Sequence, residues 1–163
     1  MLNAAACIRA ARPADISQLL CLMGELAEFE GYLDEFAVTV ADLQARAFGP
    51  DAQCRIHVAE VAGAVQGYAV TLSIPFTYDL RPTLLLKELY VRASHRSAGL
   101  GERLLKDVAN WALSRGAGRL KWNVLAGNQL AEQFYQRHGG RRVAKWLAYE
   151  MDAASLTRLA AVP

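Results

Sequence analysis

The segment that most constrains the fold is Leu84–Gly101, in which an apolar run is followed by a basic, glycine-containing turn. An apolar run of this length that ends at a turn is typical of a strand, so we predict a strand over Leu84–Val91. The residues after it predict an amphipathic helix over Gly99–Arg115, because one stripe of apolar side chains recurs at helical spacing: Leu100, Leu104, Val108 and Trp111. The segment therefore predicts a strand joined to a long helix by a short turn.

The turn itself, Arg96–Glu102, is called the glycine turn below. Gly99 and Gly101 let the backbone approach a ligand closely, and the first N–H groups of a helix have no partner within the helix. Basic residues surround it: Arg92, His95, Arg96, Arg103 and Lys106. Two interpretations stay open at this point, a site for a polyphosphate and a glycine-rich helix start with a solvated basic face.

Two common phosphate-binding motifs are absent from this sequence. A Walker loop requires Gly, four residues and then Gly-Lys-Ser/Thr, and no such run occurs. A dinucleotide motif requires a third glycine three residues after the second, but that position is Leu104. What remains is the pattern Arg-x-x-Gly-x-Gly after a strand.

Composition limits the classes of protein to which the chain can belong. Its 163 residues predict one domain spanning 1–163, and 53% hydrophobic with 21% charged residues argues against disorder. A net charge of +2 is too small to indicate nucleic acid as the main partner. We expect no membrane partner either, since no apolar run approaches ~18 residues and the start lacks the pattern of a signal peptide.

Cysteine and histidine patterns predict neither disulfides nor a metal site. The cysteines are odd in number, widely spaced and set among apolar residues, so we expect reduced, buried thiols at Cys7, Cys21 and Cys54. The histidines lack the spacing of metal ligands: His57, His95 and His138. The sequence therefore predicts a soluble, cytoplasmic protein without a metal.

The remaining patterns predict an α+β fold, with a mixed sheet and helices on both faces. A short strand at Cys7–Ala10 precedes a helix from Pro13 to about Glu30, and a capping box starting at Thr39 predicts a second helix that ends at Ala47. Asn128 is the expected N-cap of a helix over Gln129–His138. Further strands are predicted at Cys54–Val61, Ala64–Ile74, Arg119–Leu125, Arg141–Ala144 and Trp146–Met151.

A second segment, Leu120–Gly140, supports a specific interpretation of the first. It combines a strand-like start, a polar Asn128 and the pair Phe134-Tyr135, followed by Arg137 and Gly139. The run Arg96-Ser-Ala-Gly99-Leu-Gly101 resembles the acyl-CoA signature of the GCN5-related N-acetyltransferase (GNAT) superfamily. Leu120–Gly140 looks like the second acyl-CoA segment of the same superfamily, and the two occur in the expected order.

The similarity extends to the diamine (spermidine/spermine) and thialysine acetyltransferase branch, from about Ile8 to Met151. It rests on Leu26-Ala-Glu-Phe-Glu30 followed by Asp42-Leu43, on Phe76-Thr-Tyr-Asp79, on Glu88-Leu-Tyr-Val91, and on Asn128 with Phe134-Tyr135. The resemblance implies the GNAT fold, a central and mostly antiparallel sheet with helices on both faces and one pair of parallel strands that splay apart.

The resemblance also implies acetyl-CoA as the co-substrate. Its pantetheine arm is expected to pair with the backbone of one splayed strand, and its pyrophosphate to accept hydrogen bonds from the glycine turn. The residues implied are Leu89, Tyr90, Val91, Arg96, Ser97, Ala98, Gly99, Leu100, Gly101, Glu102, Asn128, Ala131 and Tyr135. For Asn128, a role as a helix cap alone is equally possible.

The implied reaction is direct attack of an amine on the thioester in a ternary complex. An alkylamine with a lysine-like pKa is only about 0.04% neutral at pH 7, so a base is needed. Glu88 is the candidate base, acting through water, and the alternative is a strand carboxylate paired with a neighbouring cation. Tyr135 is the expected partner of the departing thiolate, by hydrogen bonding with late proton transfer, because full transfer from a phenol is uphill by about 2 kcal/mol.

Acceptor choice is where the sequence differs from the branch that it resembles. Glu30 matches an acidic acceptor-side position, beside Phe29 where that branch usually has Tyr, but Lys87 stands where the branch commonly has an acidic residue. Basic residues also replace acidic ones after Gly140, at Arg141, Arg142 and Lys145. Such a surface disfavours a polycation and favours an amine that also bears a carboxylate or phosphate. We therefore expect a small amine metabolite other than spermidine.

Three functions follow from these patterns. The first is acetyl transfer to the primary amine of a small molecule, in a homodimer of the kind common in this superfamily. The second is acetylation of a protein N-terminus or lysine, and the third is a non-catalytic acyl-CoA sensor. Tyr135 and Glu88 favour an enzyme over a sensor, because a pure binding module needs neither.

Overall fold

The computed structural model describes residues 6–162 and divides into two compact units, with the boundary after Asn123. The first unit contains the whole sheet and three α-helices, and the second contains the last two helices. The two units are described separately below.

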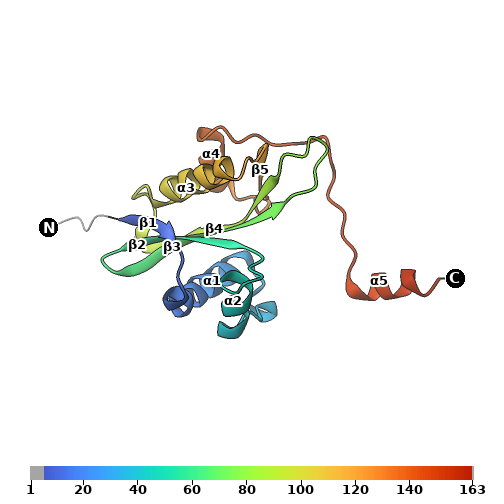
Figure 1. Ribbon diagram of the computed structural model, residues 1–163, viewed down its shortest axis with the longest axis horizontal. Helices are drawn as coiled ribbons and strands as arrows, with labels where there is room; N and C mark the ends of the chain where they lie inside the picture. Colours follow the sequence, from blue (N-terminus) through green and yellow to red (C-terminus); the bar gives the residue numbers. More distant parts are fainter. Residues whose placement is uncertain (1–5, 163) are drawn as a thin grey trace. The chain divides into compact units, whose positions relative to one another are not determined.

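The first unit is built on one five-stranded sheet in the order β1-β2-β3-β4-β5 (Figure 1). Three pairs of neighbours are antiparallel, and only β4 and β5 run parallel. The strands are β1 (Cys7–Ala10), β2 (Arg55–Val61), β3 (Ala64–Ile74), β4 (Thr83–Val91) and β5 (Arg119–Lys121). The mixed, mostly antiparallel sheet predicted from the sequence is confirmed.

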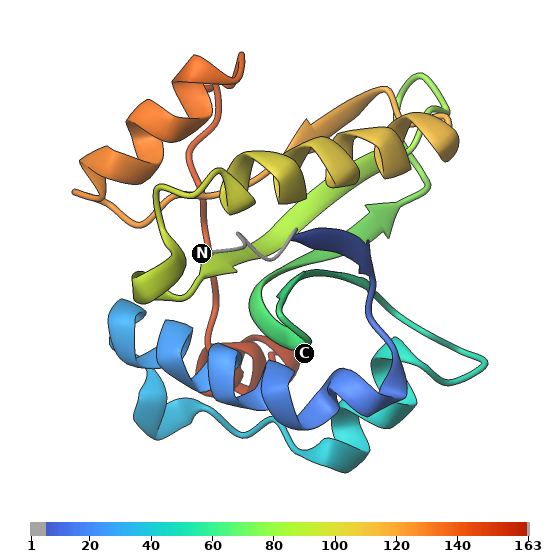
Figure 2. The same ribbon diagram turned by 90° about the vertical axis from the view of Figure 1, so that its left-hand side faces the viewer.

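Helices cover both faces of this sheet, as predicted. The helices α1 (Ile16–Glu30) and α2 (Val40–Ala47) lie on one face, and α3 (Leu100–Ser114) lies on the other (Figure 2). Short 3-10 turns at Pro13–Asp15, Leu33–Glu35 and Ala93–His95 complete the connections. Because β4 feeds α3 and α3 returns to β5, the parallel pair arises from one crossover connection.

The helix ends follow local signals in the sequence. Thr39 accepts a hydrogen bond from the Asp42 N–H at 3.2 Å, and the Asp42 carboxylate accepts from the Thr39 N–H at 2.9 Å, which is the predicted capping box. Gly31 ends α1 and Gly116 follows α3, each with a positive φ, at 82° and 69°. Only glycine adopts this conformation without strain, so both helices stop where the sequence predicts.

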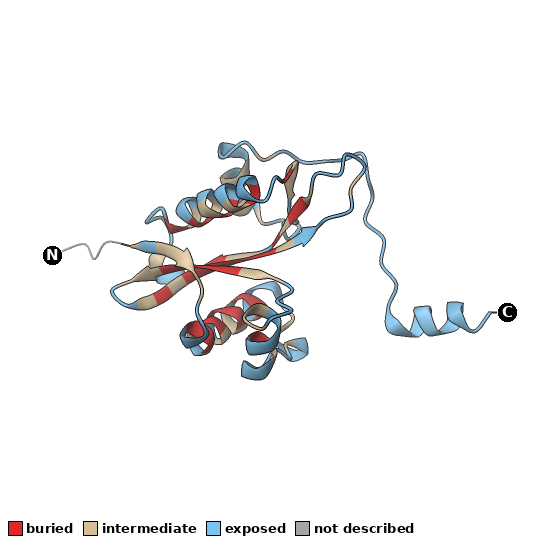
Figure 3. Ribbon diagram, viewed as in Figure 1, coloured by how far each residue is buried: buried red, intermediate tan, exposed pale blue. Residues whose placement is uncertain are grey.

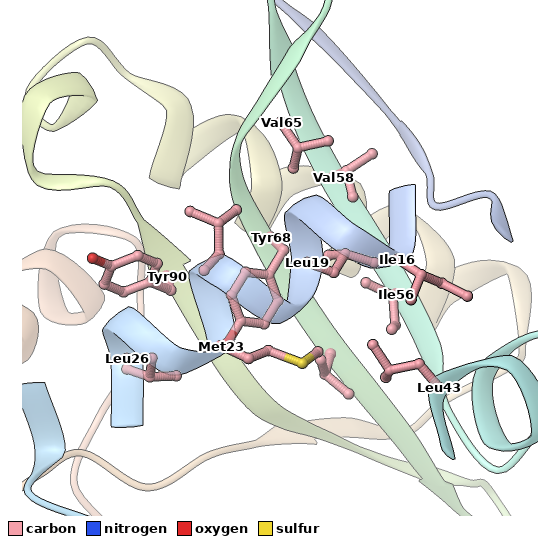
Figure 4. Packing of buried hydrophobic residues seen from close by; sticks show 12 residues of the cluster. Ile16, Leu19, Met23, Leu26, Leu43, Ile56, Val58, Val65, Tyr68 and Tyr90 are labelled. Atoms are coloured by element: carbon pink, nitrogen blue, oxygen red, sulfur yellow. The ribbon is translucent and has the colours of Figure 1, made fainter. Parts of the chain in front are cut away.

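The main core lies between α1, α2 and the sheet (Figure 4). Its helix side comes from the stripe Ile16, Leu19, Leu22, Met23 and Leu26, and its sheet side from Ile56, Val58, Val65, Tyr68, Val70 and Tyr90. Burial of this many apolar side chains is the largest stabilising term for a domain of this size. Figure 3 shows the buried positions concentrated on the sheet and on the helix faces that meet it.

The second unit differs from the prediction. It contains α4 (Gln129–Arg137) and α5 (Ala153–Ala160), of which only α4 was expected. The two strands predicted at Arg141–Ala144 and Trp146–Met151 are not formed, and the described residues 141–152 are in coil. An alternating apolar pattern gives a segment the tendency to be a strand, but a strand needs a partner for its backbone groups, and none pairs with this segment in the described part of the chain.

The cysteine prediction was wrong about burial. All three thiols are free, but Cys7 and Cys21 are exposed and Cys54 is half-buried. Cys7 lies on β1, an edge strand, and Cys21 lies on the outward side of α1, so apolar neighbours in sequence did not mean burial. Over residues 6–162, no helix is both long and apolar enough to cross a bilayer.

Candidate active site

The glycine turn has the backbone geometry of an anion site. It follows β4 and a 3-10 turn, and two of its residues, Ser97 and Gly99, adopt positive φ values of 64° and 77°. Gly99 is the N-cap of α3, so the N–H groups of Leu100, Gly101 and Glu102 have no partner within the helix. A Cβ at Gly99 would meet no atom within 4 Å, so the turn is open on that side. The turn can therefore hold a phosphate with its backbone.

The pairing of the two parallel strands ends near the start of β4, well before the chain reaches this turn. The strand β4 pairs with β3 over nearly its whole length, but with β5 only from Thr83 to Leu85. The following residues of β4, up to Val91, have a strand on one edge only among the described residues. Backbone groups on the other edge are available to an extended, amide-containing ligand. The splayed pair implied by the sequence resemblance is confirmed.

Arg96 links the glycine turn to the end of β4. Its Nε donates to the carbonyl oxygen of Val91 at 2.9 Å, and its guanidinium lies over the rings of Tyr90 and Phe29, at 5.5 and 5.8 Å from their centroids. The side chain remains exposed. Arg96, Val91, Tyr90 and Phe29, which are all candidate site residues from the sequence, are thus brought together.

An ion pair fixes the end of α1 against β4. Arg92 donates to Glu25 at 2.8 Å, and the Tyr90 hydroxyl donates to the same carboxylate at 3.0 Å. The guanidinium of Arg92, together with the Tyr90 hydrogen bond, holds the pKa of Glu25 below its usual value. Phe29 and Glu30 lie one turn further along α1, both exposed. The pair therefore holds the end of α1, which carries the candidate residues Phe29 and Glu30, against the end of β4.

A β-bulge at Lys87 sets the direction of Glu88. Val70 pairs with Glu88 and Thr71 pairs with Leu86, so Lys87 has no partner on β3. Before the bulge, Leu84 packs with Ala112 of α3, whereas after it Tyr90 belongs to the core against α1. Leu84 and Tyr90, which are an even number of positions apart, thus lie on opposite faces of the sheet. The extra residue places Glu88 on the same face as Tyr90, toward α1.

Glu88 is half-buried and anchored by one hydrogen bond. The hydroxyl of Tyr68, a fully buried residue, donates to Glu88 Oε2 at 2.7 Å. Burial raises the pKa of Glu88 above its usual value, and the Tyr68 hydrogen bond and the charge of Lys87 partly oppose that rise. Burial and then the charges of Glu88 and Glu30 raise the pKa of Tyr32, which lies nearby. A carboxylate in this setting is a stronger base than an exposed one, which suits proton transfer.

The second unit contains the remaining candidates, all on or beside α4. Asn128 Oδ1 accepts from the Ala131 N–H at 3.1 Å, so Asn128 caps the helix as the sequence predicts. Ala131 and Tyr135 are half-buried on the same helix. The Tyr135 ring meets Phe134 edge to face, at 5.1 Å between centroids. These contacts define the local setting of Tyr135 within its own unit.

Sequence reasoning missed three features of the site. Neither Tyr68 nor Tyr32 was singled out from the sequence, and Leu84–Val91 was predicted as one strand without a bulge at Lys87. The only signal for the bulge was the charged pair Lys87-Glu88 within an otherwise apolar strand. No metal was predicted, and among residues 6–162 no group of three or more His, Cys, Asp or Glu side chains could hold one.

The fold defines the general class of the protein. An integron cassette protein from the mobile metagenome of V. cholerae superposes with a TM-score of 0.80 at 23% identity, covering 96% of this chain and 98% of the other. An aminoglycoside acetyltransferase from an uncultured soil sample superposes with a TM-score of 0.74 at 15% identity, over 90% of this chain and 97% of the other. The chain therefore shares the fold of acetyltransferases.

The sequence then places the chain within that class. The model of the acetyltransferase (GNAT) family matches residues 22–140, and the chain belongs to this family. A thialysine N-epsilon-acetyltransferase from Sus scrofa is 28% identical over 94% of this chain and 96% of its own length. A spermidine/spermine N(1)-acetyltransferase-like protein from Homo sapiens is 30% identical over 81% of this chain, which corresponds to 20% of that protein. The resemblance to this branch is confirmed, and the chain is an N-acetyltransferase of a family that generally uses acetyl-CoA.

Proposed function

We propose that this protein transfers an acetyl group from acetyl-CoA to the primary amine of a small-molecule acceptor, within a single domain spanning residues 1–163. The single observation that carries the proposal is the half-buried Glu88, which accepts a hydrogen bond from Tyr68 of β3 and lies in the part of β4 that does not pair with β5. If the pantetheine arm pairs with Leu89–Val91 and the pyrophosphate binds the glycine turn, the thioester would come close to Glu88, the proposed base.

The residues have separate roles in this reaction. Backbone N–H groups of Ser97–Glu102 and the charge of Arg96 would bind the pyrophosphate. Glu88 takes a proton from the acceptor ammonium, through water, and the neutral amine attacks the thioester carbon. A C–N bond forms and the C–S bond breaks, and the thiolate leaves with a hydrogen bond from Tyr135 before it is protonated.

The acceptor class follows from the charges near Glu88. Glu30 and Glu88 lie close enough for each to influence the pKa of Tyr32, so this region favours an ammonium group. Lys87 is exposed on the bulge, and Arg141 and Arg142 are exposed in the second unit. An acidic region beside the exposed Lys87 favours an amine that also bears a carboxylate, and the relatives named for thialysine support an amino-acid acceptor.

A thiol-release assay across amino acids, amino sugars, aminoglycosides and polyamines tests the proposal. We expect turnover with an amino acid that carries a side-chain amine, and weaker turnover with spermidine. Glu88→Gln should lower kcat about 100-fold, because general-base catalysis typically contributes at least this much. Glu28→Gln, an exposed neighbour of the site on α1, is the matched control and should keep full activity.

Three outcomes would count against this proposed function. Equal activity of Glu88→Gln and the wild type would remove Glu88 as the base. Turnover confined to peptide N-termini or lysines would favour a protein acetyltransferase. Acetyl-CoA binding by calorimetry, without turnover on any amine or peptide, would favour a sensor.

We also propose that the protein is a cytoplasmic homodimer, with the segment from Leu147 to Leu159 at the interface. Large apolar side chains in and beside this segment are exposed, including Trp146 at 71%, Leu147 at 80% and Tyr149 at 92% (Figure 3). Such a surface is unfavourable in water and is typical of an interaction site. Light scattering should give a mass of twice 17.8 kDa, and Leu147→Glu should give a monomer. A monomeric wild type at micromolar concentration would reject the dimer.

A further inference from the structure

Tyr68 is a buried side chain that contacts Glu88 and that the proposed reaction does not yet explain. It lies on β3, is completely buried in the core against α1, and its ring is tilted against Tyr90 at 6.3 Å between centroids (Figure 4). A phenylalanine would fill the same apolar volume, so packing alone does not require the hydroxyl. That hydroxyl donates to Glu88 Oε2 at 2.7 Å.

The register of the sheet explains how the two residues meet. Tyr68 pairs with Tyr90, and Val70 pairs with Glu88, so Tyr68 and Glu88 are diagonal neighbours on adjacent strands. Pairing is regular from Glu88 to Tyr90, so both side chains face α1, and the bulge at Lys87 allows Leu84 in the first half of β4 to face α3. If β4 instead alternated regularly from Leu84 through Lys87, the carboxylate would lie on the face away from Tyr68.

Resting on the proposed function, we propose that Tyr68 is a positioning residue for the base: its hydroxyl fixes Oε2 of Glu88 and leaves Oε1 as the oxygen that receives the acceptor's proton. A glutamate side chain has several rotamers, and one short hydrogen bond from a rigid buried ring selects among them. A fixed carboxylate presents its free oxygen in one direction, which matters because proton transfer depends on alignment.

The phenol is suited to this task because it keeps its proton. Burial, together with the charge of Glu88 and their hydrogen bond, raises the pKa of Tyr68 far above its usual value. Tyr68 therefore donates at every pH at which the enzyme would work, and it does not compete as a base. Its hydrogen bond to the ionised carboxylate offsets part of the rise that burial causes in the pKa of Glu88.

The other groups near Glu88 do not replace this contact. Glu30, at the end of α1, raises the pKa of Glu88 by its charge, and Lys87 on β4 lowers it. Tyr32, after α1, and the Cys54 thiol, before β2, feel the charge of Glu88, which raises the pKa of each. Of the groups named here, only Tyr68 has a hydrogen bond to Glu88 in the structure. Its removal should therefore change the titration of the base directly.

Tyr68→Phe tests the proposal through the pH dependence of kcat/KM. Loss of the hydrogen bond destabilises the ionised carboxylate, so the pKa of Glu88 rises and the acidic limb should move up by about one pH unit. Raising the pH should restore most of the activity, and KM for acetyl-CoA should not change. A merely structural role would lower the activity at every pH without moving the limb. Tyr78→Phe, which removes an exposed phenol hydroxyl bound by Arg119, is the control and should leave the limb in place.

A double-variant cycle separates coupling from general damage. In the Glu88→Gln background, Tyr68→Phe should lower kcat less than twofold, because the carboxylate that it positions is gone. Equal effects of Tyr68→Phe in both backgrounds would overturn the proposal, as would an acidic limb that stays in place. Thermal unfolding of each variant shows whether the protein remains folded.

A titration that needs no turnover distinguishes failure of this proposal from failure of the proposed function. Carbon-13 NMR of glutamate-labelled protein, with Glu88 assigned from the Glu88→Gln spectrum, reports its pKa in the wild type and in Tyr68→Phe. Turnover with an unchanged Glu88 titration rejects the role of Tyr68 alone. A shifted titration without turnover on any amine rejects acetyl transfer with Glu88 as the base. The hydrogen bond between Tyr68 and Glu88 would then have no role in catalysis.

Discussion

The two units of this chain obtain their structure in different ways. Residues up to Asn123 bury a continuous core on the sheet, whereas no described residue from Val124 to Val162 is in the buried class. Each helix of the second unit is nonetheless well capped, α4 by Asn128 and α5 by Asp152. The comparison teaches that local signals are enough to define helices, while only a shared core can define a sheet. It also separates the candidate catalytic groups, because Glu88 belongs to the core-rich unit and Tyr135 to the other.

The largest expected effect tests the core of the first unit. Leu19→Ala should lower the free energy of unfolding by about 2–5 kcal/mol, because Leu19 is fully buried and its removal leaves a cavity. Leu130→Ala, at an 81% exposed position of α4, should change it by less than about 0.5 kcal/mol. Urea denaturation measures both. Similar losses would mean that the second unit has a core of its own and would break the comparison.

The second-largest effect tests whether the second unit, which has no buried core, contributes to the reaction. Tyr135→Phe should lower kcat about 100-fold, or about 2.7 kcal/mol in the transition state, while the dissociation constant of acetyl-CoA stays the same. Calorimetry and a thiol-release assay measure the two quantities separately. Tyr149→Phe, at a 92% exposed tyrosine of the same unit, is the control. Full activity of Tyr135→Phe would show that the Tyr135 hydroxyl is not needed, and the catalytic groups would then be sought in the first unit.

A pH effect on stability should come from the first unit. Burial lowers the pKa of His57, although hydrogen bonding to Asp107 at 2.7 Å opposes this and the charge of Arg55 adds to it. A folded pKa below the usual 6.5 means that the unfolded chain binds the proton more readily. Stability should therefore fall as pH drops below about 6.5 toward the folded value, by at most about 1.4 kcal/mol per pH unit.

The control for this effect is the variant His57→Gln, whose side chain at position 57 does not titrate. Unfolding in urea at several pH values between 7 and 5 should show a shallower decrease for the variant than for the wild type. Parallel curves would show that the buried imidazole does not contribute, and that carboxylates alone set the acid sensitivity.

The smallest effect tests the local signals of the second unit. Asn128→Ala should destabilise α4 by about 1 kcal/mol, seen as faster hydrogen exchange of the Ala131 amide. Asn128→Asp keeps a capping oxygen and should preserve that protection. If Asn128 only caps the helix, Asn128→Asp also keeps the affinity for acetyl-CoA. A large loss of affinity in this variant would show that the amide contacts the pantetheine arm as well.

The sequence predicted best what depends on neighbours along the chain. The capping box at Thr39, the glycine stops at Gly31 and Gly116, and the Asn128 cap all follow from a few adjacent residues. The hairpin between β2 and β3 was likewise predicted from the strand-like pattern of its two segments and from the tight turn between them. For the candidate site, the sequence resemblance identified the glycine turn and the splayed strands because both depend on short motifs.

The predictions that failed concern features that depend on contacts between residues far apart in the sequence. The alternation in Trp146–Met151 cannot reveal whether a partner strand is present, and the apolar neighbours of Cys21 cannot reveal which side of α1 faces outward. The bond between Tyr68 and Glu88 joins residues 20 positions apart and exists only in one strand register. Register is a property of two strands, so neither strand predicts it alone.

The unpaired residue at position 87 also limits how the gene can change length. Leu84 faces α3 and Tyr90 faces α1 although they are an even number of positions apart, and one unpaired residue reconciles this spacing with opposite faces. Deleting Lys87 would make Leu86 and Glu88 neighbours opposite Thr71 and Val70, so β4 would regain regular alternation with Leu84 and Tyr90 on their present faces. Loss of the single codon triplet for residue 87 should therefore be tolerated by the fold better than loss of two neighbouring triplets, and substitutions at 87 should leave the fold intact.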